Sequence, residues 1–84
     1  VVKERQIVCL PLKIDADSPF ARKSIKNCGI RQQYKATIIG IERGDLPIIN
    51  PDIETVIRRE DIIWVMGGDS MVKWMIADDL LQER

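Results

Sequence analysis

Residues 62–67 are the stretch that most constrains the fold of this chain. They read Ile-Ile-Trp-Val-Met-Gly, with two acidic residues before them and Gly-Asp after them. A short apolar run that is rich in β-branched and aromatic residues and bounded by turn residues is typical of a buried strand. Because strand side chains alternate, Trp64 points to one face, and Ile63 and Val65 point to the other. Neither face is polar, so the strand needs a cover on both sides.

The chain is too short to supply both covers easily. Its 84 residues predict one domain over 1–84, and a domain of this size buries only about 60 % of the surface that the unfolded chain exposes. One face can take a helix of the same chain. We expect a second copy to cover the other face, since a symmetric pair is the commonest oligomer. The residues assigned to the core and the dimer contact are Ile38, Ile39, Ile63, Trp64 and Val65.

The remaining strands follow from similar patterns. Residues 7–14 predict a first strand, which contains Pro11 and therefore lies at an edge of the sheet. Residues 37–43 predict a second strand, and Gly-Asp at 44–45 predicts a turn into a short returning strand at 47–50. Residues 55–57 predict a short extended piece.

Two helices are expected. Ser24 can cap a short helix over 25–28 that Gly29 ends in the left-handed conformation, and 31–34 can add another turn. A C-terminal helix is predicted over 69–81, with Asp69 as its N-cap. Its apolar stripe consists of Val72, Met75, Ile76 and Leu80, widened by Met71, Trp74 and Leu81. This order predicts a small α+β domain with a mostly antiparallel sheet, a short helix after the first strand and a C-terminal helix.

The composition argues against an enzyme. The chain has no histidine, so it lacks the commonest general base and cannot form a Ser-His-Asp or Cys-His constellation. Its two cysteines, Cys9 and Cys28, lack metal-site spacing and are interpreted as buried, reduced thiols. The 13 basic and 13 acidic residues cancel, which predicts no nucleic-acid partner. No apolar run is long enough to span a membrane.

Charged pairs occur at several turns. The carboxylate pairs at 15–17, 60–61 and 78–79 lack the converging oxygens that calcium requires, and we interpret them as solvated. Arg58-Arg59 is interpreted as a solvated turn, with an anion site as the alternative. Arg31 can reach a phosphate with a bidentate contact, with a surface salt bridge as the alternative.

Seven short pieces, in order along the chain, resemble the TrkA-C domain, the C-terminal half (RCK_C) of the regulators of potassium conductance. They are Ser-Pro-Phe at 18–20, Lys-Ser-Ile at 23–25, Gly-Ile-Arg at 29–31, Ile-Ile-Gly-Ile-Glu-Arg-Gly at 38–44, Asn-Pro-Asp at 50–52, Thr-Val at 55–56 and the strand at 61–67. The resemblance covers about residues 6–81. The Ile-Glu-Arg and Asn-Pro-Asp pieces and the Trp64 strand look most like the C-terminal domains of bacterial Kef-type potassium/sodium:proton antiporters.

The resemblance implies a non-enzymatic regulatory domain that is part of a longer transporter or channel-regulator chain at the cytoplasmic face of the bacterial inner membrane. Its implied partners are a second copy and a transmembrane antiporter or channel. The resemblance implies no cofactor, but a regulatory ligand in or near the dimer groove, either cyclic di-AMP or a monovalent or divalent cation. The alternatives are a purely structural dimerisation module of a potassium channel or transporter, and a domain of an anion transporter.

By resemblance to members that bind cyclic di-AMP, the ligand-binding residues are Ile25, Ile30, Arg31, Thr37 and Pro51. The sequence also departs from the family. Lys35 stands where most members have glycine, and Glu60 stands where Gly-Asp is usual, so strain or a rebuilt turn is expected at both. No histidine is present for the ligand contact that some members make.

Overall fold

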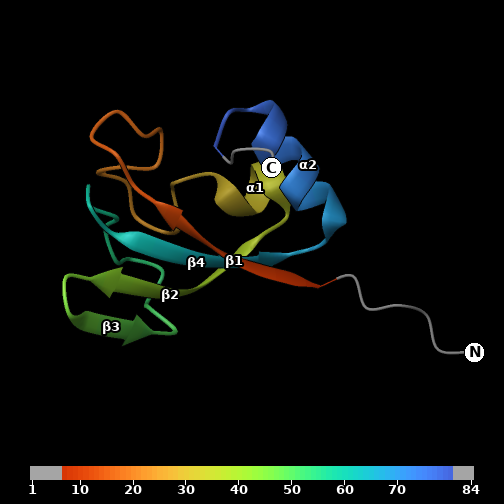
Figure 1. The fold of residues 1–84 in the computed structure, drawn as a ribbon. Coiled ribbons are helices and arrows are strands. Elements are labelled where there is room, and N and C mark those ends of the chain that lie inside the picture. Colours follow the sequence, from red (N-terminus) through yellow and green to blue (C-terminus); the bar gives the residue numbers. More distant parts are fainter. Residues whose placement is uncertain (1–6, 81–84) are drawn as a thin grey trace, which may run out of the picture.

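A four-stranded antiparallel sheet forms the centre of the molecule, a computed structural model that describes residues 7–80 (Figure 1). The spatial order of the strands is β1-β4-β2-β3. The elements are β1 (Val8–Lys13), α1 (Ile30–Tyr34), β2 (Thr37–Arg43), β3 (Leu46–Ile49), β4 (Ile62–Gly67) and α2 (Asp69–Ala77). The predicted α+β class is confirmed, and β1 lies at an edge of the sheet, where its Pro11 is tolerated.

Strand β4 is the inner strand that its sequence predicted, and it pairs with β1 on one side and β2 on the other. Ile63 and Val65 are fully buried on the face that carries both helices (Figure 1). Trp64 is half-buried and Met66 is 37 % exposed on the opposite face. No helix within residues 7–80 covers that face, so its burial against a second copy stays a prediction.

A β-bulge at Ile39 changes the alternation of β2. The register against β4 shifts between the residues on either side of it. Because the bulge adds one residue, Ile38 and Ile41 both point to the helix-covered face and are buried. Ile39 itself is half-buried. The bulge thereby gives β2 two core residues that simple alternation would place on opposite faces.

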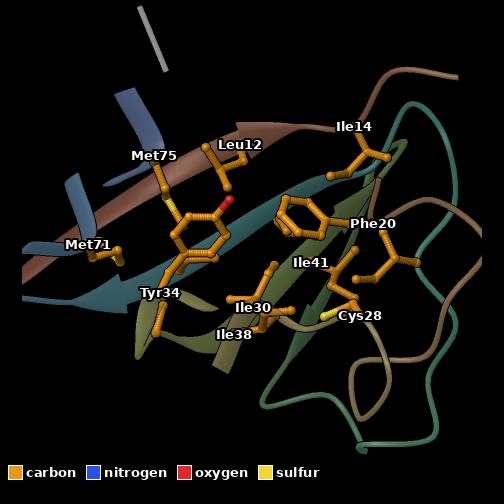
Figure 2. Close-up of a cluster of buried hydrophobic side chains, with 14 residues drawn as sticks. Leu12, Ile14, Phe20, Cys28, Ile30, Tyr34, Ile38, Ile41, Met71 and Met75 are labelled. Carbon is orange, nitrogen blue, oxygen red and sulfur yellow. The ribbon is translucent and has the colours of Figure 1, made fainter. Parts of the chain in front are cut away.

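The core lies between the sheet, the two helices and the loop after β1. Figure 2 shows Phe20 from that loop and Tyr34 from α1 side by side at its centre. Their rings meet edge to face at 6.3 Å between centroids, a geometry that contributes about 0.5–1.5 kcal/mol beyond area burial. Met71 and Met75 of α2 are buried in the same cluster, on the helix-covered face of the sheet. These contacts hold the five-residue helix α1, which could not persist alone.

The helix predicted over 25–28 is wrong. Residues 25–27 form a single turn, in which the Ser24 hydroxyl accepts a hydrogen bond from the Asn27 N–H at 3.2 Å. Helix α1 begins at Ile30, directly after Gly29 with φ 87°. Gly29 is left-handed, as predicted, but it precedes a helix instead of ending one. The further helical turn predicted at 31–34 is confirmed as part of α1.

The predicted N-cap of the C-terminal helix is also wrong. Gly68 occupies the N-cap position, and Asp69 is the first helical residue and makes no capping hydrogen bond. The N-cap residue is the one whose side chain normally accepts from the free N–H groups, and glycine has no side chain to do so. The Asp69 carboxylate still lies at the positive end of the helix dipole.

The apolar stripe of α2 is narrower than predicted. Met71 and Met75 are buried, but Trp74 is 41 % exposed. The helix ends at Ala77 instead of continuing to 81, and Leu81 lies outside the described residues. Acidic side chains at 78–79 oppose the negative end of the helix dipole, which is the physical reason for an early end.

Lys35 and Glu60, the two positions where this chain lacks the glycine usual in the family, both adopt the left-handed conformation. Lys35 follows α1 with φ 52°, and Glu60 precedes β4 with φ 73°. The Lys35 N–H donates to the Arg31 carbonyl at 3.1 Å, so the turn that closes α1 is formed. An L-residue in this conformation costs roughly 1–2 kcal/mol. The turns are therefore kept, with strain at the two side chains.

Candidate functional site

A cavity of about 290 Å³ opens between α1, the start of β2 and the segment that follows β3. All five residues predicted for the ligand site line it: Ile25, Ile30, Arg31, Thr37 and Pro51. They come from four separate parts of the chain, so the fold brings them together. Their role in binding stays a prediction. We call this space the α1 cavity.

Backbone hydrogen bonds fix the wall of the α1 cavity. The Ile25 N–H donates to the Thr55 carbonyl, and the Lys26 N–H donates to the Ile53 carbonyl, both at 2.9 Å. These bonds tie the turn at 25–27 to the 53–55 segment. The wall is thus held by backbone pairing and does not depend on the identity of its side chains.

Helix α1 supplies the opposite wall. Gly29 adopts φ 87°, which lets the chain turn sharply into the helix. Ile30 is 1 % exposed and packs inward, whereas Arg31 is exposed at the mouth of the cavity. The guanidinium is therefore free to meet a ligand from solvent while the aliphatic residue beside it shapes the wall.

The lining is apolar with cationic and neutral polar groups. Its lining residues among 7–80 include no carboxylate. Lys26 and Asn50 also line the cavity, and the sequence-based site did not include them. Asn50 belongs to the Asn-Pro-Asp piece of the family resemblance, which was the signal for it; Lys26 had none beyond its place after Ile25. Such a surface favours an anionic ligand with flat or aliphatic parts.

Cys28 lies in the same wall but is not suited to redox chemistry. It is 5 % exposed, and its thiol donates a hydrogen bond to the Ile25 carbonyl at 3.2 Å. Burial raises the pKa of the Cys28 thiol above its ordinary value. A protonated thiol is a poor nucleophile. Both cysteines are free, as expected, although Cys9 is exposed instead of buried.

A buried ion pair between Arg43 and Asp61 holds the segment that precedes β4. Asp61 is 2 % exposed, and Arg43 donates to it from Nε at 3.0 Å and from Nη2 at 2.8 Å. Nη2 also donates to the Val56 carbonyl at 2.9 Å, and the Arg58 N–H donates to Asp61 at 2.8 Å. The interpretation of Asp61 as a solvated carboxylate is therefore wrong. No pattern in the sequence pointed to its partner, which lies 18 positions away.

The charge state of Asp61 follows from these contacts. Burial alone would raise the pKa of Asp61, but hydrogen bonds from Arg43 and the Arg58 N–H, together with both positive charges, lower it below its ordinary value. The carboxylate is therefore ionised at neutral pH. We call this cluster the Arg43–Asp61 clasp.

A second polar contact joins the cavity helix to the C-terminal helix. The Tyr34 hydroxyl at the end of α1 donates to the Asp78 carboxylate, just beyond α2, at 2.6 Å. Burial, then the hydrogen bond and the negative charge of Asp78, raise the pKa of Tyr34 to about 12. The phenol is thus a fixed donor at neutral pH.

The described residues offer no group of three or more metal-binding side chains. Likewise, none of the helices within 7–80 has the length and apolar character needed to cross a bilayer. The five residues predicted for core and dimer contact divide between the faces of the sheet. Ile38, Ile63 and Val65 are buried beneath the helices, whereas Ile39 and Trp64 are half-buried.

Comparisons with known proteins agree with this architecture. The family model of the TrkA-C domain matches residues 12–74. Probable potassium channel protein 2 of Methanocaldococcus jannaschii is 35 % identical over 72 residues, which are 86 % of this chain but only 21 % of that protein.

Two solved structures are similar over most of their own length. One is the RCK_C domain dimer of S. agalactiae BusR in complex with c-di-AMP, with 26 % identity, a TM-score of 0.72 and coverage of 87 % of this chain and 90 % of that one. The other is the RCK C domain of the potassium transport protein KtrA in complex with cyclic diadenosine monophosphate, with 32 % identity, a TM-score of 0.65 and coverage of 86 % and 80 %.

Proposed function

Because the chain belongs to the TrkA-C domain family, we propose that it is a regulatory domain of a potassium transporter or channel and that it binds cyclic di-AMP in the α1 cavity. The transporter we favour is a potassium/sodium:proton antiporter, with this domain at the cytoplasmic face of the bacterial inner membrane. The domain performs no catalysis itself. Ligand binding would change the domain, and the domain would gate the transmembrane portion.

The observation that carries this proposal is the convergence of five predicted residues on one cavity. Ile25 and Pro51 offer apolar surface to the faces of the adenine bases, and the buried Ile30 shapes the wall behind them. Arg31 offers a forked donor for a phosphate, and Thr37 offers a hydroxyl. Support also comes from the BusR and KtrA domains, both of which are described as complexes with this nucleotide.

The ligand is two-fold symmetric, which suits a dimer. We propose that two copies pair so that their α1 cavities face each other across the axis, each giving one Arg31 to one phosphate. A cavity lined by cations and free of carboxylates would otherwise bring like charges together at such an interface. A dianionic ligand removes that repulsion, so ligand and dimer would stabilise each other.

Calorimetric titration with cyclic di-AMP tests the proposal. We expect saturable heat with the wild-type chain and at least tenfold weaker binding with Arg31→Ala, about 1.4 kcal/mol. Lys73→Ala, which removes an exposed cation of α2 outside the cavity, should bind as wild type. A thermal shift on adding the nucleotide should accompany binding, since a ligand of the folded state raises stability.

An absence of heat and of thermal shift would remove cyclic di-AMP. The same screen with monovalent and divalent cations would then test ion sensing, and a negative result there would favour a module that only assembles a transporter. If Lys73→Ala weakened the binding of cyclic di-AMP as much as Arg31→Ala does, binding would depend on the overall positive charge of the chain and not on the cavity. The transported ion is tested separately by flux through the whole transporter in vesicles.

A further inference from the structure

A second cavity of about 340 Å³ lies apart from the α1 cavity and shares no lining residue with it. Three arginines line it, Arg22, Arg58 and Arg59, and its other lining residues are alanine, valine and isoleucine. It lies between the loop after β1 and the segment before β4, which run side by side at the left of Figure 1. We call it the arginine cavity.

Backbone pairing fixes the two segments that carry the arginines. The Arg22 N–H donates to the Ile57 carbonyl, and the Ile57 N–H donates to the Lys23 carbonyl, both at 2.8 Å. The Arg58 N–H is in turn bonded to the Asp61 carboxylate at 2.8 Å. The arginines at 22 and 58 therefore start from anchored backbone on opposite sides of the cavity. Anchored donors lose less conformational freedom when they bind a ligand.

The three guanidinium groups make no close ion pair in the described part of the chain, although the more distant charge of Arg58 helps to lower the pKa of Asp61. None lies within 4.0 Å of a carboxylate in residues 7–80, and no carboxylate lines the cavity. The two acids that follow the arginines are already engaged elsewhere. Glu60 pairs with Lys13 at 3.5 Å, and Asp61 pairs with Arg43 at 2.8 Å. An excess of positive charge therefore remains in this cavity, as it does in the α1 cavity, on a chain whose net charge is zero.

We propose that the arginine cavity is an anion site that binds a phosphate group. Arginine presents planar, forked donors that match phosphate oxygens, and several arginines together suit a multiply charged anion better than a single carboxylate. The alanine and valine side chains around them can contact the organic part of a phosphate ester. The phosphate can belong to a free anion or to a lipid headgroup. Binding at this place would report a second signal, independent of the α1 cavity.

A titration of the ¹⁵N-labelled chain with pyrophosphate, followed by NMR at constant ionic strength, tests the site. We expect saturable shifts at residues 16–23 and 56–59, whether or not pyrophosphate also shifts residues of the α1 cavity. Arg58→Gln and Arg22→Gln should each weaken binding at least tenfold. Lys73→Gln, which removes an exposed cation of α2 outside both cavities, is the matched control and should bind pyrophosphate as wild type. Thermal midpoints of all variants show whether they remain folded.

A parallel arm uses vesicles of phosphatidylcholine with and without phosphatidic acid. Binding to phosphatidic acid vesicles that is lost in Arg58→Gln, without binding of pyrophosphate, would support the site and assign it to a headgroup. Pyrophosphate binding alone would assign it to a free anion. Failure of both probes to bind saturably at residues 16–23 and 56–59, or equal weakening by Lys73→Gln and Arg58→Gln, would overturn the proposal. Because the two cavities share no lining residue, shifts at residues 16–23 and 56–59 are read separately from any shifts at the proposed nucleotide site.

Discussion

Replacing Arg43 by methionine should expose how strongly the Arg43–Asp61 clasp stabilises the fold. The substitution keeps the aliphatic stem and removes two charge-assisted hydrogen bonds to a carboxylate that is 2 % exposed. At about 1.5 kcal/mol for each, the loss is about 3 kcal/mol. This lies at the low end of the roughly 3–5 kcal/mol for breaking a buried pair, which is reasonable because Arg43 is 25 % exposed and Asp61 keeps the Arg58 N–H.

Urea unfolding followed by tryptophan fluorescence measures this loss at pH 7. Lys13→Met is the matched control, because it breaks the Lys13–Glu60 pair, whose side chains are 61 % and 72 % exposed. Exposed pairs contribute about 0–1 kcal/mol, so the control should unfold close to wild type. An Arg43→Met midpoint that matches the Lys13→Met midpoint would refute the importance of the clasp.

The pH dependence gives an independent check. The lowered pKa of Asp61 means that its contribution is present above the unfolded pKa of about 3.9 and is lost as pH falls through the folded pKa. In Arg43→Met, the Arg43 contacts that help to outweigh the burial of Asp61 are lost, so its pKa should rise and its protonation should remove the buried charge. The stability difference between wild type and variant should therefore shrink from pH 7 to below pH 4. A difference that stays constant across this range would contradict the electrostatic explanation.

Three further predictions concern strain, a hydrogen bond and a half-buried ring. In urea melts, Lys35→Gly should raise the free energy of unfolding by up to about 1 kcal/mol, because glycine relieves the strain of the left-handed φ of 52°. The control Lys23→Gly changes a residue without positive φ and should lower the free energy of unfolding by about 0.5–1 kcal/mol. Ultraviolet difference titration should show Tyr34 ionising near pH 12, because burial and the bond to Asp78 both raise its pKa. Its contribution to stability is full below the unfolded pKa of about 10 and is lost as pH rises through the folded value, and Tyr34→Phe should remove that dependence. A midpoint near 10 would mean that the phenol is neither buried nor bonded to Asp78. In urea melts of the monomer, Trp64→Ala should lower the free energy of unfolding by less than the roughly 3–5 kcal/mol expected for a fully buried tryptophan, because Trp64 is half-buried. A loss of roughly 3–5 kcal/mol would mean that the second face of the sheet is already covered.

The strands were predictable because their signals are local. Alternating or continuous apolar runs bounded by Gly, Pro and Asp mark β1, β2 and β4, and a two-residue turn marks the hairpin to β3. The helix before α1 was misplaced because a glycine after an apolar turn is commonly a helix end. Gly29 instead lets the chain enter α1, and the turn before it pairs with residues 53–55. That pairing is not visible in the sequence.

In the candidate site, too, some residues could be predicted from the sequence and others could not. The five cavity residues were available from the family resemblance, and the structure places them together. The Arg43–Asp61 clasp and the Tyr34–Asp78 bond join residues 18 and 44 positions apart, and neither spacing follows from a periodic pattern. Likewise, Arg58 and Arg59 were interpreted as a solvated turn because the sequence does not show that Arg22 lines the same cavity.

The stoichiometry of cyclic di-AMP binding tests the central claim most directly. We expect calorimetric titration of the wild-type chain to saturate at one nucleotide for two chains, with sedimentation showing a dimer in the saturated sample. This ratio follows from two α1 cavities that share one symmetric ligand. Saturation at one nucleotide for each chain with a monomer in sedimentation, or no binding at all, would contradict a shared nucleotide site between two copies.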